Sequence, residues 1–213
     1  RRVFVGNFGN SQGTLTIAGG DCFIAGDLFL AFSGSATGTV WVTGGQLTND
    51  SIRIGHLNFG QMTVSNGTVS AKTVFVGGDN VGSRGIWMIA GGTNNVDTSL
   101  TLGNSVCSST GTVTLAGGRL FVTNATGNAV LEVRSGTVTL NSGTLTADQL
   151  VITNACSHFI RTGGTLVYGS ALLNPNDDTD SDGIPNAFDL DPLNPADAGA
   201  DPDGDGFTNL EEF

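Results

Sequence analysis

The sequence has 213 residues, a formal net charge of -11, 33 glycines and 38% hydrophobic residues. A balance this acidic, without a basic patch, argues against nucleic-acid binding. The charge is unevenly placed, because eight basic and seven acidic residues precede Pro175, whereas Pro175 to Phe213 holds twelve carboxylates and no Lys or Arg. We therefore divide the chain into residues 1–173 and residues 174–213.

A Gly-containing phrase recurs seven times in residues 1–173. Two copies are G-T-L-T-I-A-G-G, ending at Gly20, and G-T-V-T-L-A-G-G, ending at Gly118. The last glycines of the seven copies, 21 to 26 residues apart, are Gly20, Gly45, Gly67, Gly92, Gly118, Gly143 and Gly164. This period excludes a propeller, whose blades need about 40 residues each. It suits one coil of a β-solenoid.

Each repeat predicts three short strands, because apolar and polar residues alternate at period two and β-branched residues are frequent. The first strand directs these pairs inward: Leu15/Ile17, Val40/Val42, Met62/Val64, Trp87/Ile89, Val113/Leu115 and Val138/Leu140. The second strand contributes one inward column: Cys22, Leu47, Val69, Leu120, Leu145 and Leu166. The third contributes Leu28/Leu30, Ile52/Ile54, Val74/Val76, Leu100/Leu102, Leu131/Val133 and Leu150/Ile152. The expected fold is all-β, a three-sided parallel β-solenoid of about seven coils over residues 1–173, with the Gly doublets at its corners and a length on the order of 30 to 35 Å.

The first residues match a third strand, so the first coil is incomplete and has no capping helix. A strand edge without a neighbour is a surface on which another strand can pair. Phe4, Phe29 and Phe75 are expected to point outward from third strands, with Arg53 in the intervening coil. Such a row marks either a contact surface or a groove in which the C-terminal segment docks. The candidate interface residues are Val3, Phe4, Val5, Phe29 and Phe75.

The charged residues of the solenoid predict a surface ladder rather than a catalytic site. Asp50, Lys72 and Asp97 fall on successive coils near one column, and Asp148 follows in the same column. Two carboxylates two rungs apart, about 9.6 Å, lie at the upper edge of the spacing in inverting glycosidases. A lysine between them neutralises them instead of activating them, so we expect no enzymatic activity.

Three cysteines are an odd number, whereas a disulfide framework needs an even one. Cys22 shares the inward column of Leu47, which predicts a buried thiol. Cys107 and Cys156 fall in loops between third and first strands, two coils apart. Alternate rungs are roughly 9.6 Å apart, too far for a disulfide unless the loops lean together. An intermolecular bridge is the alternative.

Residues 174–213 contain one ligand pattern written twice, D-x-D-x-D-G-x-x-N, beginning at Asp178 and at Asp201. Calcium takes six to eight oxygen ligands, so a short loop must turn alternate side chains inward, and a Gly permits the sharp bend. The twelfth position of the second copy is Glu212, where an EF-hand-type loop places a bidentate carboxylate. In the first copy this position is Asp189, which Asp191 could complete or replace. The spacing predicts calcium binding.

The two phrases resemble thrombospondin type 3 repeats and the related dockerin-like calcium loops of exported bacterial proteins. The resemblance covers Asn174 to Phe213 and implies two calcium sites in a small module over residues 174–213. The ligands that it implies are Asp178, Asp180, Asp182, Ile184 through its carbonyl, Asn186 and Asp189, and then Asp201, Asp203, Asp205, Phe207 through its carbonyl, Asn209 and Glu212.

The solenoid repeats, Val3 to Gly169, are similar to the autotransporter-type β-strand repeats of exported bacterial surface proteins. This resemblance implies an extracellular or cell-surface location and a structural or adhesive role. The sequence begins at Arg1 without Met and has no apolar run of membrane-spanning length, so we expect an export signal to have been removed or to lie outside it. The expected function is a calcium-stabilised fibre or filament subunit that associates head to tail or laterally. The alternatives are a glycan-binding adhesin and, less favoured, a polysaccharide lyase or hydrolase.

Overall fold

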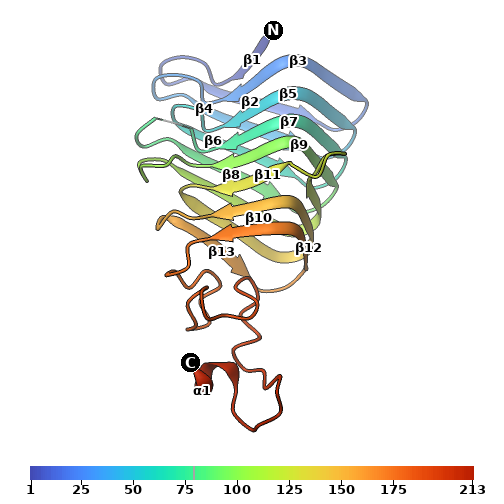
Figure 1. Cartoon of the computed structure of the whole chain (residues 1–213). Coiled ribbons are helices and arrows are strands. Elements are labelled where there is room, and N and C mark those ends of the chain that lie inside the picture. The colour runs from blue at the N-terminus through green and yellow to red at the C-terminus, as the bar shows by residue number, and fades with distance from the viewer. Residues whose placement is uncertain (79) are drawn as a thin grey trace.

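The structure is a computed structural model that describes residues 1–78 and 80–213 (Figure 1). Its regular secondary structure is almost entirely β-strand, and one short helix lies near the C-terminus. The elements are β1 (Arg2–Val5), β2 (Gln12–Ile17), β3 (Asp21–Leu30), β4 (Thr37–Val42), β5 (Gln46–Ile54), β6 (Phe59–Val64), β7 (Thr68–Val76), β8 (Arg84–Ile89), β9 (Thr93–Leu102), β10 (Thr110–Val122), β11 (Val130–Val133), β12 (Gly136–Ile152), β13 (Ser157–Arg161), β14 (Thr165–Leu173) and α1 (Asn209–Glu212).

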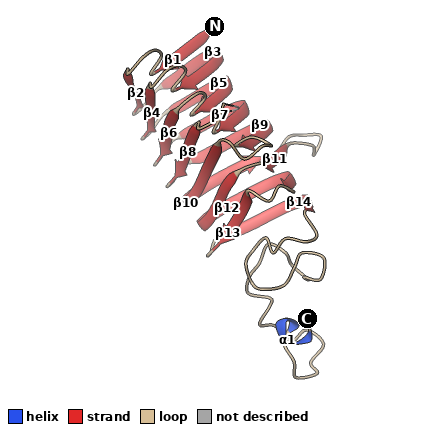
Figure 2. Ribbon diagram, turned by 90° about the vertical axis from the view of Figure 1, so that its left-hand side faces the viewer, coloured by secondary structure: helices blue, strands red, loops and turns tan. Residues whose placement is uncertain are grey.

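The strands wind into a parallel β-solenoid of about seven coils, which confirms the predicted fold class (Figure 2). One ladder runs through β2, β4, β6, β8, β10, β12 and β13. Another begins at β1 and continues through β3, β5, β7, β9, β11 and β12. Every pairing is parallel and joins equivalent positions of successive coils, so each coil has hydrogen-bonding partners only in its neighbours.

The second and third strands of most coils are continuous, whereas the sequence suggested two separate strands. In β3 the pairing with β5 shifts register between Ile24 and Asp27, and in β7 the pairing with β9 shifts between Ala71 and Thr73. An extra residue in a ladder bends a strand without ending it. The corner between these two faces is therefore a bulge rather than a turn.

The core consists of the predicted inward columns. Leu115, for example, pairs with Ile89 and Leu140 in the first-strand ladder and is fully buried. The second-strand column contains one polar residue, Asn94, which is also fully buried and donates from Nδ2 to the backbone oxygen of Arg119 at 3.1 Å. This hydrogen bond offsets part of the cost of an amide at an otherwise aliphatic position.

Glycines lie at the other two corners of most coils. The last glycine of every predicted doublet has a positive φ, between 67° and 87°, as the corner assignment requires. A second column of glycines begins the first strands: Gly13, Gly38, Gly60, Gly85, Gly111 and Gly136. A Cβ on Gly85 would lie 2.2 Å from the backbone oxygen of Ile54, so this column lets the first strand begin directly against the preceding third strand.

Residues 174–213 continue from the last coil and lie beyond that end of the solenoid (Figure 1). The side chain of Leu193 is 1% exposed and belongs to the same apolar cluster as the solenoid core, where Leu166 and Leu173 of the last coil are only partly buried. The first half of the module therefore covers the end of the core. The second half, from Asp201 onward, is mostly exposed.

Cys107 and Cys156 form a disulfide, with 5.9 Å between their Cα atoms, so the expectation that they are too far apart is wrong. The connection of the intervening coil, between Val133 and Gly136, is only two residues long. Because this connection is so short, the loop that holds Cys107 and the loop that holds Cys156 approach each other across it. Asn154 Nδ2 of the second loop donates to Ser105 O of the first at 2.9 Å. Cys22 is a free thiol and is half-buried rather than fully buried, because at this position β3 pairs with β5 and with no other described strand.

Candidate metal centre in the C-terminal module

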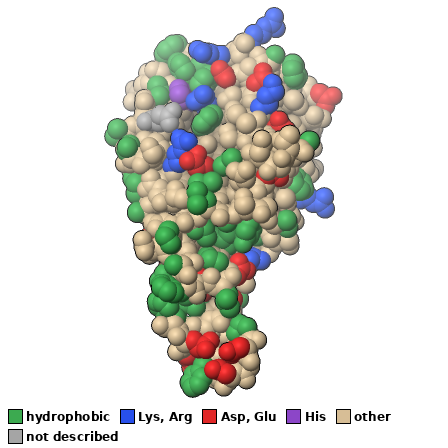
Figure 3. Space-filling model, in the orientation of Figure 1, with side chains coloured by type: hydrophobic (Ala, Val, Ile, Leu, Met, Phe, Trp, Pro, Cys, Tyr) green, Lys and Arg blue, Asp and Glu red, His purple; other side chains and the backbone are tan. Residues whose placement is uncertain are grey.

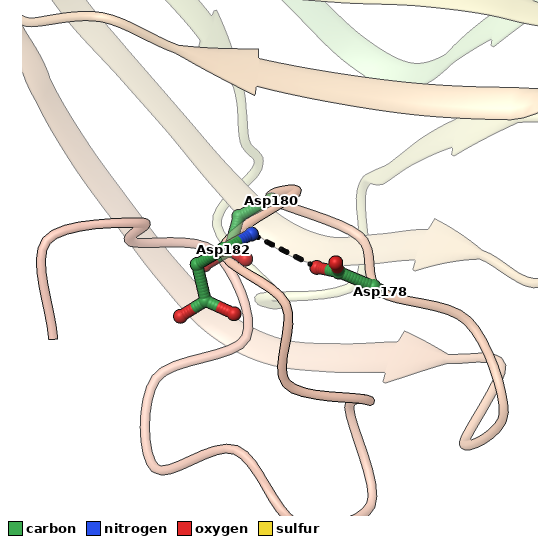
Figure 4. A group of neighbouring side chains, drawn as sticks. All are labelled: Asp178, Asp180 and Asp182. Carbon is green, nitrogen blue, oxygen red and sulfur yellow. Dashed lines mark hydrogen bonds between the residues drawn. The ribbon is translucent and has the colours of Figure 1, made fainter. Parts of the chain in front are cut away.

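The first aspartate-rich loop is shaped by its own carboxylates. Asp178 accepts hydrogen bonds from the backbone N–H of Asp182 at 3.1 Å and of Gly183 at 2.9 Å, and Asp182 accepts from Ile184 N at 2.8 Å. Ser181 and Gly183 both have positive φ, which makes the turn tight. One carboxylate oxygen from each of Asp178, Asp180 and Asp182 lies within 4.8 Å of the others (Figure 4).

A second cluster lies next to the first and shares Asp182 with it. One carboxylate oxygen each of Asp182, Asp189 and Asp197 lies within 4.8 Å of the others. The backbone N–H of Asp191 donates to Asp189 Oδ1 and to Asp197 Oδ2, both at 2.9 Å, and so ties the two side chains together. Asp191, expected as an alternative ligand, contributes this backbone group, and its side chain is in none of the described clusters.

Asp180 is the most buried carboxylate of the module. Its residue is 6% exposed, and neither carboxylate oxygen has a hydrogen-bond partner among the described residues. Burial, together with the nearby Asp182 and Asp189 carboxylates, raises the pKa of Asp180 to about 7, although the Asn194 N–H opposes this without reaching hydrogen-bond geometry. Burial of an unpaired charge is costly, so the site favours a bound cation or a proton.

The neighbouring cluster has the same electrostatic character. Burial raises the pKa of Asp189 to about 6, and the Asp197 and Asp182 carboxylates add to the shift. One oxygen each of Asp182, Asp189 and Asp197 is also buried without a hydrogen-bond partner. Four carboxylates with unpaired buried oxygens thus converge on one small volume.

The second loop repeats the turn but is open to solvent. Asp201 accepts from the N–H groups of Gly204 and Gly206 at 2.8 and 3.1 Å, and Asp205 accepts from Phe207 N at 2.9 Å. Oxygens of Asp201, Asp203 and Asp205 lie within 4.8 Å of one another. Asp203, and to a lesser degree burial and the other two aspartates, raises the pKa of Glu212, but Glu212 is not part of this cluster. Acidic side chains gather at this far end of the molecule (Figure 3).

Two other predicted ligands, Asn186 and Asn209, use their side chains in hydrogen bonds within the module. The amide of Asn186 accepts from Thr179 N at 3.1 Å and donates to Asn174 O at 2.6 Å. Asn209 Nδ2 donates to Asp197 O at 2.7 Å and so connects the second loop to the first. Ile184 is buried, whereas Phe207 is 58% exposed.

Sequence reasoning missed Asp197. It lies eight residues after Asp189 and outside both copies of the repeated phrase, so no spacing rule selects it. Its only signal was a position two residues after the Asn-Pro pair at residues 194–195, within a segment already rich in aspartate.

The donor set consists of carboxylate oxygens, which suit a hard cation such as calcium better than a thiophilic transition metal. Comparison with protein-family models, with curated proteins and with solved structures found no significant match to this chain. Among the described residues no helix has both the length and the apolar character needed to cross a membrane.

The predicted charge ladder is present on the solenoid. Lys72 Nζ lies 2.8 Å from Asp50 Oδ1, and this hydrogen bond, with a further contribution from Asp97, raises the pKa of Lys72. The ladder borders a shallow groove of about 500 Å³, whose other lining residues include Phe23, Thr48 and Asn95. Phe23 is 74% exposed.

The candidate interface residues lie on the first coils, but their aromatic rings do not form an exposed row. Phe29 is only 4% exposed, because Phe4 stacks on it at 5.4 Å between ring centroids and Phe32 contacts it edge-on at 5.0 Å. The Arg53 guanidinium lies over the Phe75 ring at 4.5 Å. Val5 is buried, Phe4 and Phe75 are half-buried, and Val3 is 36% exposed.

Proposed function

We propose that the chain is a structural β-solenoid of an exported bacterial surface protein and that its C-terminal module binds calcium. The observation that carries the calcium proposal is the burial of Asp180. This residue is only 6% exposed, and its two carboxylate oxygens, beside Asp178 and Asp182, have no hydrogen-bond partner among the described residues. The structural role is supported by the continuous core. The Cys107–Cys156 disulfide supports an extracellular location, because disulfides persist in oxidising compartments.

In this proposal the first loop holds calcium through Asp178, Asp180 and Asp182, and the exposed second loop through Asp201, Asp203 and Asp205 with Glu212. A bound cation relieves the repulsion among these carboxylates. The module should therefore be ordered with calcium and loosened without it.

Isothermal titration calorimetry tests calcium binding directly. Asp182→Ala should weaken binding at the first loop and Asp205→Ala at the second, while each leaves the other loop intact. Asp50→Ala is the matched control, since it removes an exposed carboxylate that already has a lysine partner. The absence of calcium uptake by the wild-type protein at millimolar concentrations would rule out the proposal.

We further propose that copies of the chain associate head to tail into a filament. The N-terminal end presents β1 and β2, each of which has a strand neighbour on one side only among the described residues, together with the exposed Phe8 and the basic Arg1 and Arg2. The opposite end carries the acidic module, where Phe188, Leu190 and Phe213 line a hollow of about 540 Å³. The two ends are thus complementary in charge, and both are apolar.

The joint then lies between the first coil of one copy and the calcium module of the next, because the first half of that module covers the last coil. Such a contact does not close on itself and builds a filament. Val3 and Phe4 would contribute to it, whereas Val5 and Phe29 would support it from inside their own chain.

Light scattering and electron microscopy of the calcium-loaded, concentrated protein test the filament. Phe8→Glu and Phe188→Glu should each leave monomers, because they place a carboxylate in the joint. Val81→Glu, which changes an 84%-exposed residue on a side loop, should still assemble. Wild-type protein that stays monomeric would contradict head-to-tail assembly.

The groove beside the charge ladder favours glycan binding as a second candidate. Phe23 offers an exposed ring on which a sugar can stack, and Thr48, Asn95 and the paired Asp50 offer hydrogen-bonding groups. The Lys72 ammonium only partly neutralises the Asp50 and Asp97 carboxylates that line the groove. A neutral glycan therefore fits better than a polyanion. Glycan-array binding by monomer that is lost in Phe23→Ala and kept in Phe8→Ala would support this function, and equal binding by both variants would exclude the groove.

A further inference from the structure

Leu193 occupies an unusual position for a residue of an acidic, loop-rich segment. It is 1% exposed and packs in the apolar cluster of the solenoid. It lies on the loop between Asp189 and Asp197, whose carboxylates meet at the second cluster. The position of Leu193 therefore depends on how that loop is closed.

The two ends of this loop repel each other when both are charged. Asp189 and Asp197 each have an unpaired buried oxygen, and so does Asp182, which joins the loop to the first calcium site. The shared N–H of Asp191 holds both carboxylates, but one neutral donor does not balance two charges. A divalent cation at Asp182, Asp189 and Asp197 would balance them and close the loop.

The stability of the last coil depends on which residues cover its apolar end. Strands β13 and β14 pair with β12 alone among the described strands, and Leu166 and Leu173 of β14 are only partly buried. Leu193 is the residue of the module that belongs to their cluster. Without it, the apolar end of the solenoid would face water, and the strands at that edge would open more often.

We propose that Asp182, Asp189 and Asp197 form a second cation site in the first half of the module, and that calcium held there seats Leu193 on the end of the solenoid. This inference rests on the proposed calcium binding. It adds that calcium controls the last coil of the solenoid, because the ion fixes the loop that caps it.

Hydrogen exchange measured by mass spectrometry on the full chain, with calcium and with chelator, tests the inference. Chelation should speed exchange in β13 and β14 by about tenfold to a hundredfold, the factor that corresponds to losing the burial of one leucine. Exchange in β4 and β6, several coils away, should not change, because each coil contacts only its neighbours.

Variants separate the second site from the others. Asp197→Asn, which keeps the shape but removes one charge, should give fast exchange in β13 and β14 even with calcium. Asp203→Asn, the matched change in the second loop, should not. Leu193→Ser should give fast exchange in both conditions.

Two results would overturn the inference. Calcium uptake by calorimetry without any change in β13 and β14 would leave calcium binding standing and disprove its control of the last coil. A calcium response that persists in Leu193→Ser would show that another residue caps the core. Failure to bind calcium at all would remove the proposed function and this inference together.

Discussion

Removal of the Cys107–Cys156 disulfide should lower the stability of the solenoid substantially. The bond closes a loop with a sequence separation of 49 residues, for which the chain-entropy model gives about 4 kcal/mol at 25 °C. The loops that it joins are already hydrogen-bonded through Asn154, so native geometry should not relax much when the bond is absent. The expected loss of stability is therefore close to this figure of about 4 kcal/mol. It arises mainly from the greater conformational freedom of the unfolded chain.

Urea denaturation followed by circular dichroism measures this loss. The double variant Cys107→Ser/Cys156→Ser should unfold at a urea concentration about 1 to 2 M lower, for a slope of 2 to 3 kcal/mol per M. Reduction should have the same effect on the wild-type protein and on Cys22→Ala, which keeps the disulfide, whereas the double variant should not respond to reductant. If the double variant and the wild type unfold at the same urea concentration, the disulfide does not constrain the unfolded chain as described.

Three further predictions follow from the core, the glycine column and the buried carboxylates. Leu115→Asp should unfold the rod, whereas Thr114→Asp, on the outward side of the same strand, should be tolerated; equal thermal stability would show that the register is wrong. Gly111→Ala should lower the melting temperature, because its Cβ would lie 2.2 Å from Val76 O, whereas Gly199→Ala, with open space around it, should be neutral. Because the folded-state pKa of Asp180 is raised to about 7, the protonated carboxyl stabilises the calcium-free module fully below about pH 4, and this contribution is lost as the pH rises through 7. Hydrogen exchange of residues 174–198 in chelator, corrected for intrinsic rates, should then be faster at pH 8 than at pH 5, and the opposite order would contradict the burial of Asp180.

Most of the solenoid was predictable because its contacts repeat. In a parallel coil each side chain packs on equivalent positions of the coils above and below, so alternation at period two is enough to find the column of Leu115. Asn94 escaped this reasoning, since its place in the core depends on one hydrogen bond to the next coil. The burial of Phe29 also depends on neighbours, Phe4 and Phe32, that sequence alternation does not place.

The candidate site was predictable where ligands are close in sequence and not elsewhere. The turns at Asp178 and Asp201 follow from local hydrogen bonds, so their spacing is visible in the sequence. Asp197 reaches its cluster only because the loop folds back on the end of the solenoid. The disulfide was missed for a similar reason, since the length of a third loop, between Val133 and Gly136, decides whether Cys107 and Cys156 can meet.

The glycine column that begins the first strands has a consequence for how such a rod can change length. Gly60 and Gly85 occupy equivalent positions one coil apart, and a Cβ on either would lie 2.2 Å from the backbone N of the glycine after a third strand, Gly55 or Gly77. Duplication or deletion of a segment of that length would join surfaces that already fit, without new side chains at the junction. Recombination within the repeats could thus adjust the reach of the protein in whole coils, by copy number alone.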